Sequence, residues 1–470
     1  RRSHQGADGE VIARPLTFNP KKTKGVIMRE KKNVIVVMLD TLQFNYLGCY
    51  GNTRVKTPNI DRFATEGVVF ENAYTEGLPT VPCRRAMLTG RYTLPVKGWS
   101  QLDVSDTTIA DLCWGQPIDS YLIHDSGPFR LPKFGYSRGF DKVFFTNAGA
   151  DANENAMRAA RLFTGRDKIL SSYRCYHGNT GAAISATGDW RRKPNDYSRG
   201  HVHFFTPYLY RSEFSATTQE EECERALAHL EHVIQFEGPD TIAAVLLESV
   251  PGTAGIIIPP KDYFKGVREI TKKYSILMIT DEVMAGFGRT GFWFALDDYD
   301  YTPDIISFAK GCNSGYVPAG GVIMSDPVAH RFDDIVFPGG LTYSGHPLAM
   351  GAIVATQEAM EEEHIVDNAY TIGKDVLGPQ LTALYDKHPK IGEVRGKGVF
   401  WAVEMVADRT TKEPLDDATM KQIVAEGDKR GLILGVHNNR IHVTPPCVIS
   451  ADEATQGVEI LDQVLTAAGC

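Results

Sequence analysis

Short continuous apolar runs alternate with segments of helical spacing over most of the chain. From residue 143 onward the expected helices cover 152–163, 218–236 and 262–274. The apolar runs before, between and after these helices are VFFTN, KILSSY, AAVLLES, ILMITDE, IISFAK and GGVIMSD. Continuous apolar strands separated by helices are typical of a sheet that is buried on both faces. The pattern therefore predicts an α/β fold with a mainly parallel central sheet.

The pattern changes after about residue 345. A long helix over HPLAMGAIVATQEAMEEE is expected, followed by helices near 368–387, 416–430 and 451–468 and by one strand in GVFWAVEMV. Helices outnumber strands here, and they are not interleaved with them. This part predicts a smaller C-terminal α+β domain.

The chain before residue 143 has its own pattern of apolar and polar positions. NVIVVMLD (33–40) predicts a strand, TPNIDRFATEGVVF (57–70) a helix leading into a strand, and TTIADLC the start of a helix. Little apolar periodicity precedes them. The chain therefore divides into a loose lead-in, an N-terminal α/β segment, a large domain and a small domain, at residues 1–32, 33–143, 144–345 and 346–470.

Composition narrows the possible partners. The 470 residues carry a net charge of -8, which gives no basic surface for nucleic acid or an anionic membrane. No apolar run reaches the length of a membrane span, and no signal-peptide core is present. Eight cysteines without paired spacing favour free thiols in a reducing compartment. We expect a cytoplasmic protein that acts on small molecules.

Two glycine-containing stretches are candidates for holding a flat, phosphorylated ligand. TNAGADANENA (146–156) places Gly149 and Ala150 in a turn at a helix start, where free N–H groups suit a phosphate. YRCYHGNTGA (173–182) offers an aromatic ring, Tyr176, followed by His177. Taken alone, the first pattern is more often a plain strand-to-helix connection and the second more often part of a core.

Two charged residues end apolar strands farther along. Asp281 ends the strand in ILMITDEVMAGFGRTG, where its carboxylate could pair with a pyridinium nitrogen. Lys310 follows the strand in IISFAKGCNSG, where desolvation would let it form a Schiff base. A helix cap and a surface lysine are the plainer interpretations.

The order and spacing of these features resemble class III (ω-amino acid type) aminotransferases, pyridoxal-phosphate (PLP) enzymes of fold type I. DEVMAGFGRTG and SFAKG carry the likeness most specifically, and it extends over residues 144–470. The resemblance implies that Lys310 binds the cofactor covalently and shuttles the substrate proton, while Asp281 keeps the ring nitrogen protonated. It also implies cofactor contacts by the residues of the two glycine-containing stretches, with Tyr176 stacked on the ring.

Further roles follow from the same resemblance. Val283 would pack on the other face of the ring, and Glu248 in LLESVPGTAG would lie near it. Thr342 in GLTYSGHPLAM would reach the cofactor phosphate of a neighbouring subunit, which implies a homodimer with shared sites. Arg440 in NRIHVTPP is the candidate for the substrate carboxylate, because a guanidinium binds a carboxylate at two points. A surface arginine is the equally weighted alternative.

The implied reaction is transamination of an amino acid or ω-amino compound with a 2-oxo acid acceptor, pyruvate or 2-oxoglutarate. VPGTAGIIIPP and NRIHVTPPC are similar to the pyruvate-linked members. The amino donor and the acceptor themselves stay open.

Residues 33–143 resemble a different family, the sulfatases of the alkaline phosphatase superfamily. Asp40 would be a ligand of a divalent cation. Counted against the sulfatase signature, the nucleophile position is Thr80 rather than Cys83, with Pro82, Arg84 and Thr89-Gly90-Arg91 at the expected spacings. Formylglycine is made from Cys or Ser, so threonine argues against sulfatase chemistry and leaves a metal-dependent phosphodiesterase-like hydrolase as the alternative.

Each resemblance covers only part of its family's domain. The later metal ligands of the hydrolase have no counterpart here, and the sulfatase-like segment, an incomplete α/β segment, occupies the place of the usual N-terminal segment of the aminotransferases. We hypothesise a fusion of two truncated parents with its junction in DKVFF (141–145). Three alternatives follow: an aminotransferase whose site lacks that segment, a metal-dependent hydrolase, and a non-catalytic chimera.

Overall fold

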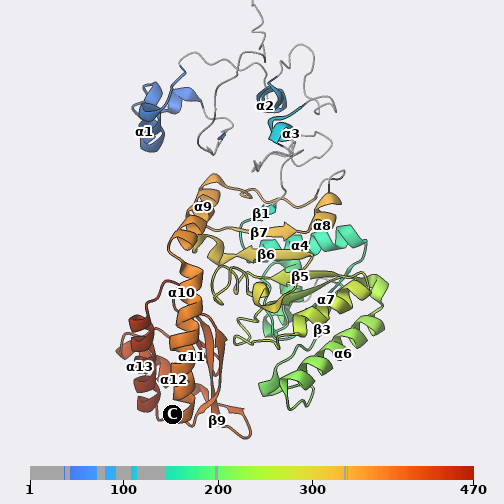
Figure 1. Cartoon of the computed structure of the whole chain (residues 1–470), viewed down its shortest axis with the longest axis vertical. Coiled ribbons are helices and arrows are strands. Elements are labelled where there is room, and N and C mark those ends of the chain that lie inside the picture. Colours follow the sequence, from blue (N-terminus) through green and yellow to red (C-terminus); the bar gives the residue numbers. More distant parts are fainter. Residues whose placement is uncertain are drawn as a thin grey trace, which may run out of the picture. The chain divides into compact units, whose positions relative to one another are not determined.

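The computed structural model describes residues 36–37, 43–70, 80–90, 107–113, 144–195, 199–332, 335 and 337–470. The chain divides into two compact units, Arg1–Thr75 and Glu76–Cys470. Figure 1 shows the helices and strands of each unit. The domain boundaries expected at residues 32, 143 and 345 stay predictions.

The first unit contains two short 3-10 helices, η1 (Phe44–Tyr46) and η2 (Gly48–Tyr50), and helix α1 (Pro58–Glu66). Asp61 on α1 accepts hydrogen bonds from the Cys49 amide (2.6 Å) and the Thr57 hydroxyl (3.0 Å), so it joins α1 to η2. The helix expected in 57–70 is confirmed, but residues 67–70 are not a strand. Most of the strand expected at 33–40 lies outside the described residues.

Two helices of the second unit precede its sheet, α2 (Thr80–Thr89) and α3 (Ile109–Cys113). Thr80, the candidate nucleophile position, is the first residue of α2. Arg84 on the same helix is buried. Asp40, the candidate metal ligand, lies outside the described residues.

A seven-stranded sheet forms the centre of the second unit, in the order β1-β7-β6-β5-β4-β2-β3. The pairs among β3, β2, β4, β5 and β6 are parallel, and only β6–β7 and β1–β7 are antiparallel. The expected mainly parallel sheet is confirmed. The strands are β1 (Phe144–Thr146), β2 (Lys168–Ser172), β3 (His201–Phe204), β4 (Ile242–Glu248), β5 (Leu277–Asp281), β6 (Ile305–Ala309) and β7 (Gly320–Met324).

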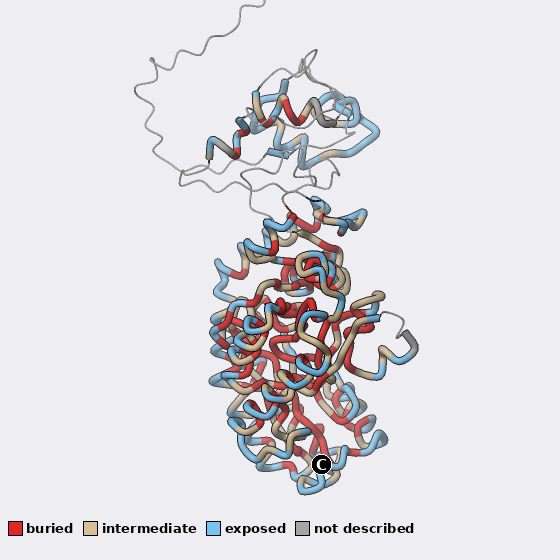
Figure 2. Tube along the Cα trace, turned by 90° about the vertical axis from the view of Figure 1, so that its right-hand side faces the viewer, coloured by how far each residue is buried: buried red, intermediate tan, exposed pale blue. Residues whose placement is uncertain are grey.

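Helices cover both faces of this sheet. Ala244 and Leu246 of β4 pack in a cluster with α4, whereas Val245 and Leu247 pack in a cluster with α6 and α7. Because alternate residues of a strand point to opposite faces and helices cover both, every residue of β4 is buried. Figure 2 shows the buried residues of the described part of the chain in red. The helices are α4 (Gly149–Thr164), α5 (Gly181–Ala186), α6 (Gln219–Glu237), α7 (Tyr263–Lys273) and α8 (Asp326–His330).

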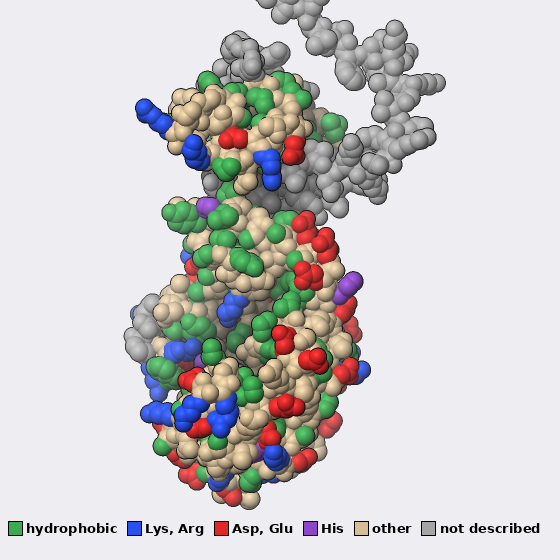
Figure 3. All heavy atoms as spheres, turned by 90° about the vertical axis from the view of Figure 1, so that its left-hand side faces the viewer, with side chains coloured by type: hydrophobic (Ala, Val, Ile, Leu, Met, Phe, Trp, Pro, Cys, Tyr) green, Lys and Arg blue, Asp and Glu red, His purple; other side chains and the backbone are tan. Residues whose placement is uncertain are grey.

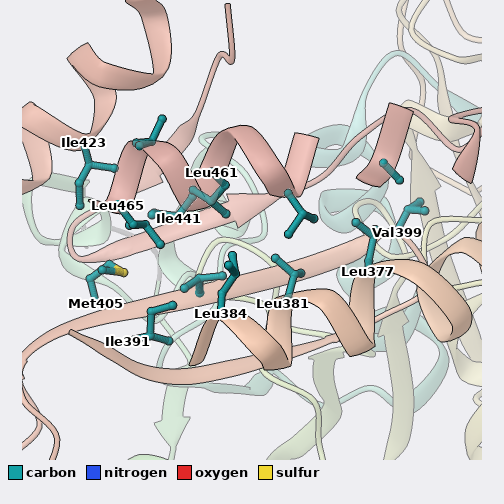
Figure 4. Close-up of a cluster of buried hydrophobic side chains, with 14 of the residues drawn as sticks. Leu377, Leu381, Leu384, Ile391, Val399, Met405, Ile423, Ile441, Leu461 and Leu465 are labelled. Carbon is teal, nitrogen blue, oxygen red and sulfur yellow. The ribbon is translucent and has the colours of Figure 1, made fainter. Parts of the chain in front are cut away.

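The C-terminal part has its own core. Helices α11 and α13 pack with α12 on strands β8, β9 and β12 around the side chains in Figure 4, which include Leu381, Ile441 and Leu461. Its elements are α9 (Pro347–Glu362), α10 (Ile365–Ile372), a π-helix (Gly373–Leu377), α11 (Gly378–Lys387), β8 (Ile391–Lys397), β9 (Phe400–Asp408), β10 (Glu413–Pro414), α12 (Asp417–Lys429), β11 (Gly435–His437), β12 (Arg440–Val443) and α13 (Ala451–Ala467).

A buried charged network connects this part to the central sheet domain. The Arg395 guanidinium on β8 donates to the Gly255 carbonyl (2.8 Å) and contacts Glu404 of β9 (2.8 Å). Glu404 also accepts from the Tyr208 hydroxyl (2.8 Å) and from Arg211 (2.7 Å). Since a buried charge requires such partners, the network fixes the C-terminal part against the Gly255 loop.

Candidate active site

Three of the predicted site residues lie at the carboxyl ends of neighbouring parallel strands. Glu248 ends β4, Asp281 ends β5 and Lys310 directly follows β6. Glu248 pairs with Asp281 in the register of β4 and β5. Open α/β sheets bind ligands at this edge, so the fold gathers the three side chains where a ligand is expected.

A cavity of about 450 Å³ opens at this edge. It is lined by the predicted residues Gly149, Ala150, Tyr176, His177, Glu248, Asp281, Val283 and Lys310, together with Asn147, Ala148, Asn153, Gly178, Asn179, Thr253, Met284, Ala309, Asn313, Gly315, Val317, Pro318 and Ala319. Residues more than 160 positions apart in the sequence thus face one space. Figure 3 shows one face of the chain, on which basic side chains gather around a recess.

The turn at Gly149 and Ala150, which was expected to hold a phosphate and is called the phosphate turn below, joins β1 to α4. The helix begins at Gly149, and a Cβ at this position would lie 2.6 Å from a methyl carbon of Val283. A side chain is therefore excluded where the backbone amides of the first helical turn reach the cavity. Gly178, at φ 133°, allows the Tyr176–Gly178 loop to approach the same turn, because a Cβ there would meet Ala150 at 2.5 Å.

Tyr176 lines the cavity beside Glu248. Its backbone amide donates to one carboxylate oxygen of Glu248 (2.9 Å), and the other oxygen accepts from the Gly252 amide (2.9 Å). Burial raises the pKa of Glu248 above its usual value. The Arg191 guanidinium covers the Tyr176 ring at 3.9 Å from its centroid, and Arg191 does not line the cavity. The ring is thus held in place from its other side.

Asp281 is buried and accepts three hydrogen bonds. Its Oδ2 atom receives Asn153 Nδ2 (2.7 Å) and contacts His177 Nδ1 (2.8 Å), and its Oδ1 atom receives the Val283 amide (2.9 Å). These contacts hold both carboxylate oxygens in a fixed orientation in the cavity wall.

His177, whose Nδ1 atom contacts Asp281, is buried as well. Burial alone lowers the pKa of His177, but its neighbours Cys175 and Asp281 outweigh this effect and raise the pKa well above the ordinary value. Its Nε2 atom is buried and has no hydrogen-bond partner among the described residues. A polar ligand in the cavity would supply a partner.

Lys310 projects from a strained position. Its φ is 46°, in the left-handed region that a residue with a side chain rarely adopts, and it begins the short 3-10 helix η9 (Lys310–Asn313). The side chain lines the cavity, but the residue is exposed in this chain. The desolvation expected for Lys310 is therefore not seen in this chain, and its candidacy rests on its backbone and its place at the cavity.

Two predicted residues do not line the cavity. Thr342 is exposed, in the turn before α9. Arg440, on β12, is partly buried, and its guanidinium donates to the carbonyl of Ala254 in the loop next to Thr253. Both roles stay predictions.

Sequence reasoning missed Asn153, Thr253 and Asn313, which also line the cavity. Asn153 had a readable signal: it lies one helical turn after Gly149 in the same motif, so its side chain shares the face of α4 that begins at the turn. Thr253 and Asn313 lie in loops whose path only the folded chain shows.

The part of the chain that the structure describes has no group of three or more His, Cys, Asp and Glu side chains placed to hold a metal ion. Within the same residues, no helix has both the length and the apolar character needed to span a bilayer.

The family model for class III aminotransferases matches residues 132–465. The chain belongs to this family. A second family model, for sulfatases, matches residues 32–172. Both resemblances seen in the sequence are thereby confirmed, and the two matches overlap over 132–172, a range that contains the predicted junction at 141–145.

Relatives of known sequence agree with the family. The hypotaurine/taurine–pyruvate aminotransferase of Paracoccus denitrificans is 34% identical over 349 residues, which are 70% of this chain and 75% of that protein. An aminotransferase of Bacillus subtilis, YhxA, is 36% identical over 330 residues, 66% of this chain and 72% of that protein.

Solved structures give the same result. The taurine:2-oxoglutarate aminotransferase of Bifidobacterium kashiwanohense, in complex with PLP and glutamate, is 42% identical with a TM-score of 0.67, and the match covers 70% of this chain and 75% of that one. An (S)-enantioselective ω-transaminase of Thermomicrobium roseum is 38% identical with the same TM-score and coverage. This chain is thus a PLP-dependent transaminase.

The cavity fits this cofactor. It combines a helix start without a side chain at Gly149, a buried carboxylate at Asp281, a lysine at Lys310 and the buried His177 nitrogen that lacks a partner among the described residues. The first three match, in order, the phosphate, the ring nitrogen and the aldehyde of PLP in chemical type.

Proposed function

We propose that the cavity at the ends of β4, β5 and β6 is the transaminase active site, and that it transfers the amino group of an ω-amino acid to pyruvate or 2-oxoglutarate. The observation that carries the proposal is the convergence of Lys310, Asp281 and Gly149 on one cavity although 161 positions separate the first from the last. The choice of donor rests on relatives that are named for taurine and for γ-aminobutyrate.

The cofactor contacts divide among the walls of the cavity. The amides at the start of α4, with Gly149 and Ala150, would hold the phosphate, and the Asp281 carboxylate would pair with the ring nitrogen. Tyr176 and Val283 would enclose the two faces of the ring. Glu248 would lie near it and, through its bonds to the Tyr176 and Gly252 amides, keeps that wall in shape.

Bound PLP supplies an electron sink for the electron pair that remains when the substrate carbon loses its proton. Lys310 would take that proton on its amine nitrogen and return it to the cofactor side, because it is the lysine of the cavity wall. The Asp281 carboxylate would stabilise the positive ring nitrogen throughout. His177, hydrogen-bonded to Asp281, keeps that carboxylate oriented.

Recognition of the substrate acid and the assembly of the enzyme are separate parts of the proposal. Arg440 would bind the substrate carboxylate or sulfonate, since its guanidinium borders the Ala254 loop beside the cavity wall. Thr342 is exposed together with Tyr343 and Leu348, as expected if a second copy of the chain covers this segment and receives the threonine at its own cofactor. The buried thiols Cys175, Cys223 and Cys312 suit a cytoplasmic enzyme.

The experiment compares the purified protein with Lys310→Ala and with Lys261→Ala, a control at an exposed lysine. After incubation with PLP and reduction with borohydride, mass spectrometry should find the phosphopyridoxyl group on Lys310. Lys310→Ala should lose this label and at least about 1,000-fold of the transamination rate. A folded, PLP-saturated protein without label on Lys310, or a Lys310→Ala variant of full activity, contradicts the proposal.

The hydrolase alternative rests on the sulfatase match of residues 32–172. The same preparations are therefore assayed with an aryl sulfate and an aryl phosphodiester in the presence of Mg²⁺ or Ca²⁺. Hydrolysis that depends on the metal and disappears in Thr80→Ala would favour that alternative.

A further inference from the structure

A chain of buried polar side chains from four parts of the fold lies behind Asp281. Ser307 of β6 donates to Asn153 Oδ1 (2.6 Å), and Asn153 of α4 donates through Nδ2 to Asp281 Oδ2 (2.7 Å). His177 contacts the same carboxylate oxygen (2.8 Å). All four residues are at most 3% exposed.

We propose that Asn153 is a positioning residue of the transaminase, which sets the orientation of the Asp281 carboxylate and ties it to the phosphate turn. The inference rests on the proposed function, because it concerns the carboxylate that would meet the cofactor ring.

The orientation of the Asn153 amide is determined by its neighbours. Its nitrogen lies 2.9 Å from the His177 carbonyl oxygen and 2.7 Å from Asp281 Oδ2. A carbonyl and a carboxylate can only accept hydrogen bonds, so both N–H groups of the amide point at them. The amide oxygen then faces the Ser307 hydroxyl, which donates. A reversed amide would set its oxygen against two acceptors, the His177 carbonyl and the Asp281 carboxylate.

This arrangement restrains Asp281. With Asn153 and His177 on Oδ2 and the Val283 amide on Oδ1, rotation of the carboxylate would break three hydrogen bonds at once. Oδ1 retains an unused lone pair, since it receives one donor and a carboxylate oxygen can accept two. The restraint therefore leaves the acid with acceptor capacity for a ring N–H.

Asn153 also joins the two ends of the cofactor site. It lies one helical turn after Gly149, where α4 begins, and Ser307 is the register partner of Asp281 in β5 and β6. One side chain thus links the phosphate turn directly to the Asp281 carboxylate, although 128 positions separate Asn153 from Asp281. Preorganised sites depend on such supporting contacts.

The test uses the full chain with Asn153→Ala, Ser307→Ala and the control Asn155→Ala. Asn155 is also buried on α4, but its amide nitrogen bonds the Asp151 carbonyl (2.8 Å). Asn153→Ala should weaken PLP affinity about 10-fold and lower kcat about 10- to 100-fold, with KM changed less than about threefold, because a lost hydrogen bond to a charged group has this magnitude. Ser307→Ala, which removes the donor to the Asn153 amide oxygen, should move both quantities in the same direction by a smaller factor.

Titration with PLP, followed by the visible absorption of the bound cofactor, separates the outcomes, with thermal unfolding as the check on folding. If the unaltered protein binds no PLP, the proposed function fails. If it binds PLP while Asn153→Ala equals it, or while Asn155→Ala loses as much as Asn153→Ala, the positioning role fails alone. Should Asn153→Ala not fold, Ser307→Ala decides the matter by the same readouts.

Discussion

At the scale of single residues, the site depends as much on atoms that are absent as on those that are present. Gly149 contributes no side chain, and Val283 occupies the space that a Cβ would need. The start of α4 can therefore meet the Val283 wall closely, and the phosphate amides lie next to a residue proposed to cover the ring.

We predict that Gly149→Ala lowers PLP affinity at least about 10-fold, because a Cβ 2.6 Å from a methyl carbon forces either the helix start or Val283 to move. Gly457→Ala is the matched control. Gly457 lies within α13, and no atom lies within 4 Å of the place that a Cβ would take, so alanine should raise the free energy of unfolding by about 0.5–1 kcal/mol there. Titration of each variant with PLP measures the first effect and urea unfolding the second. Unchanged PLP affinity in Gly149→Ala contradicts the prediction.

Several site residues were predictable from the sequence, and others were not, for a physical reason. Asp281 and Lys310 end continuous apolar runs, and the edge of a parallel sheet brings such ends together. Asn153 contacts Asp281 through side chains 128 positions apart, and no local pattern encodes that contact. The left-handed backbone of Lys310 is equally invisible, because nothing in the letters SFAKG requires it.

At the scale of elements, the end of β5 is secured by a second buried acid. Glu282 accepts hydrogen bonds from the amides of Ala295 (3.0 Å) and Leu296 (2.9 Å) in the 3-10 helix η8 (Ala295–Tyr299), and from Ser249 after β4. One carboxyl group therefore joins three segments directly beside Asp281. Burial raises the pKa of Glu282 to about 7.

This raised pKa predicts a pH dependence of stability. Between the ordinary pKa of 4.5 and about 7 the unfolded chain releases the Glu282 proton while the folded chain keeps it, so stability is fully present below pH 4.5 and falls as pH rises to about 7. The loss from this group is at most about 3 kcal/mol. Glu282→Gln does not titrate and should flatten the slope of Tm between pH 5 and 7. Glu269→Gln, at an exposed position of α7, should leave that slope unchanged; an unaltered slope in Glu282→Gln contradicts the assignment.

Among the elements, buried strands with long apolar runs were predicted well and others were missed. The edge strand β3, with the sequence HVHF, and strand β8, with IGEVRGK, carry too few apolar residues to be read as strands. Their neighbours in the sheets supply the hydrogen bonds that hold them extended. The π-helix between α10 and α11 lies within a segment that the sequence predicts as one continuous helix.

At the scale of the whole molecule, the two family models match segments of unequal length in one chain. The aminotransferase match covers 132–465 and contains the cavity, whereas the sulfatase match covers 32–172. Addition of PLP and removal of metal ions should therefore have different effects on the Tm and on the transamination rate.

We predict that PLP at about 100 times its Kd stabilises the folded chain by about 2.7 kcal/mol and raises Tm by a few degrees. EDTA should leave Tm and the transamination rate unchanged, because the proposed mechanism uses no metal. Differential scanning calorimetry with PLP, with EDTA and with both distinguishes the two effects. A Tm that falls with EDTA, or that ignores PLP in the unaltered protein, contradicts this assignment.

The pairing of Glu248 with Asp281, and of Asp281 with Ser307, across three adjacent strands has a further consequence. The relative positions of these groups along the strand direction depend on strand pairing and not on the length of the segments that link the strands. Insertions or exchanges in those connecting segments can thus change other parts of the cavity wall while Glu248, Asp281 and Ser307 keep their register.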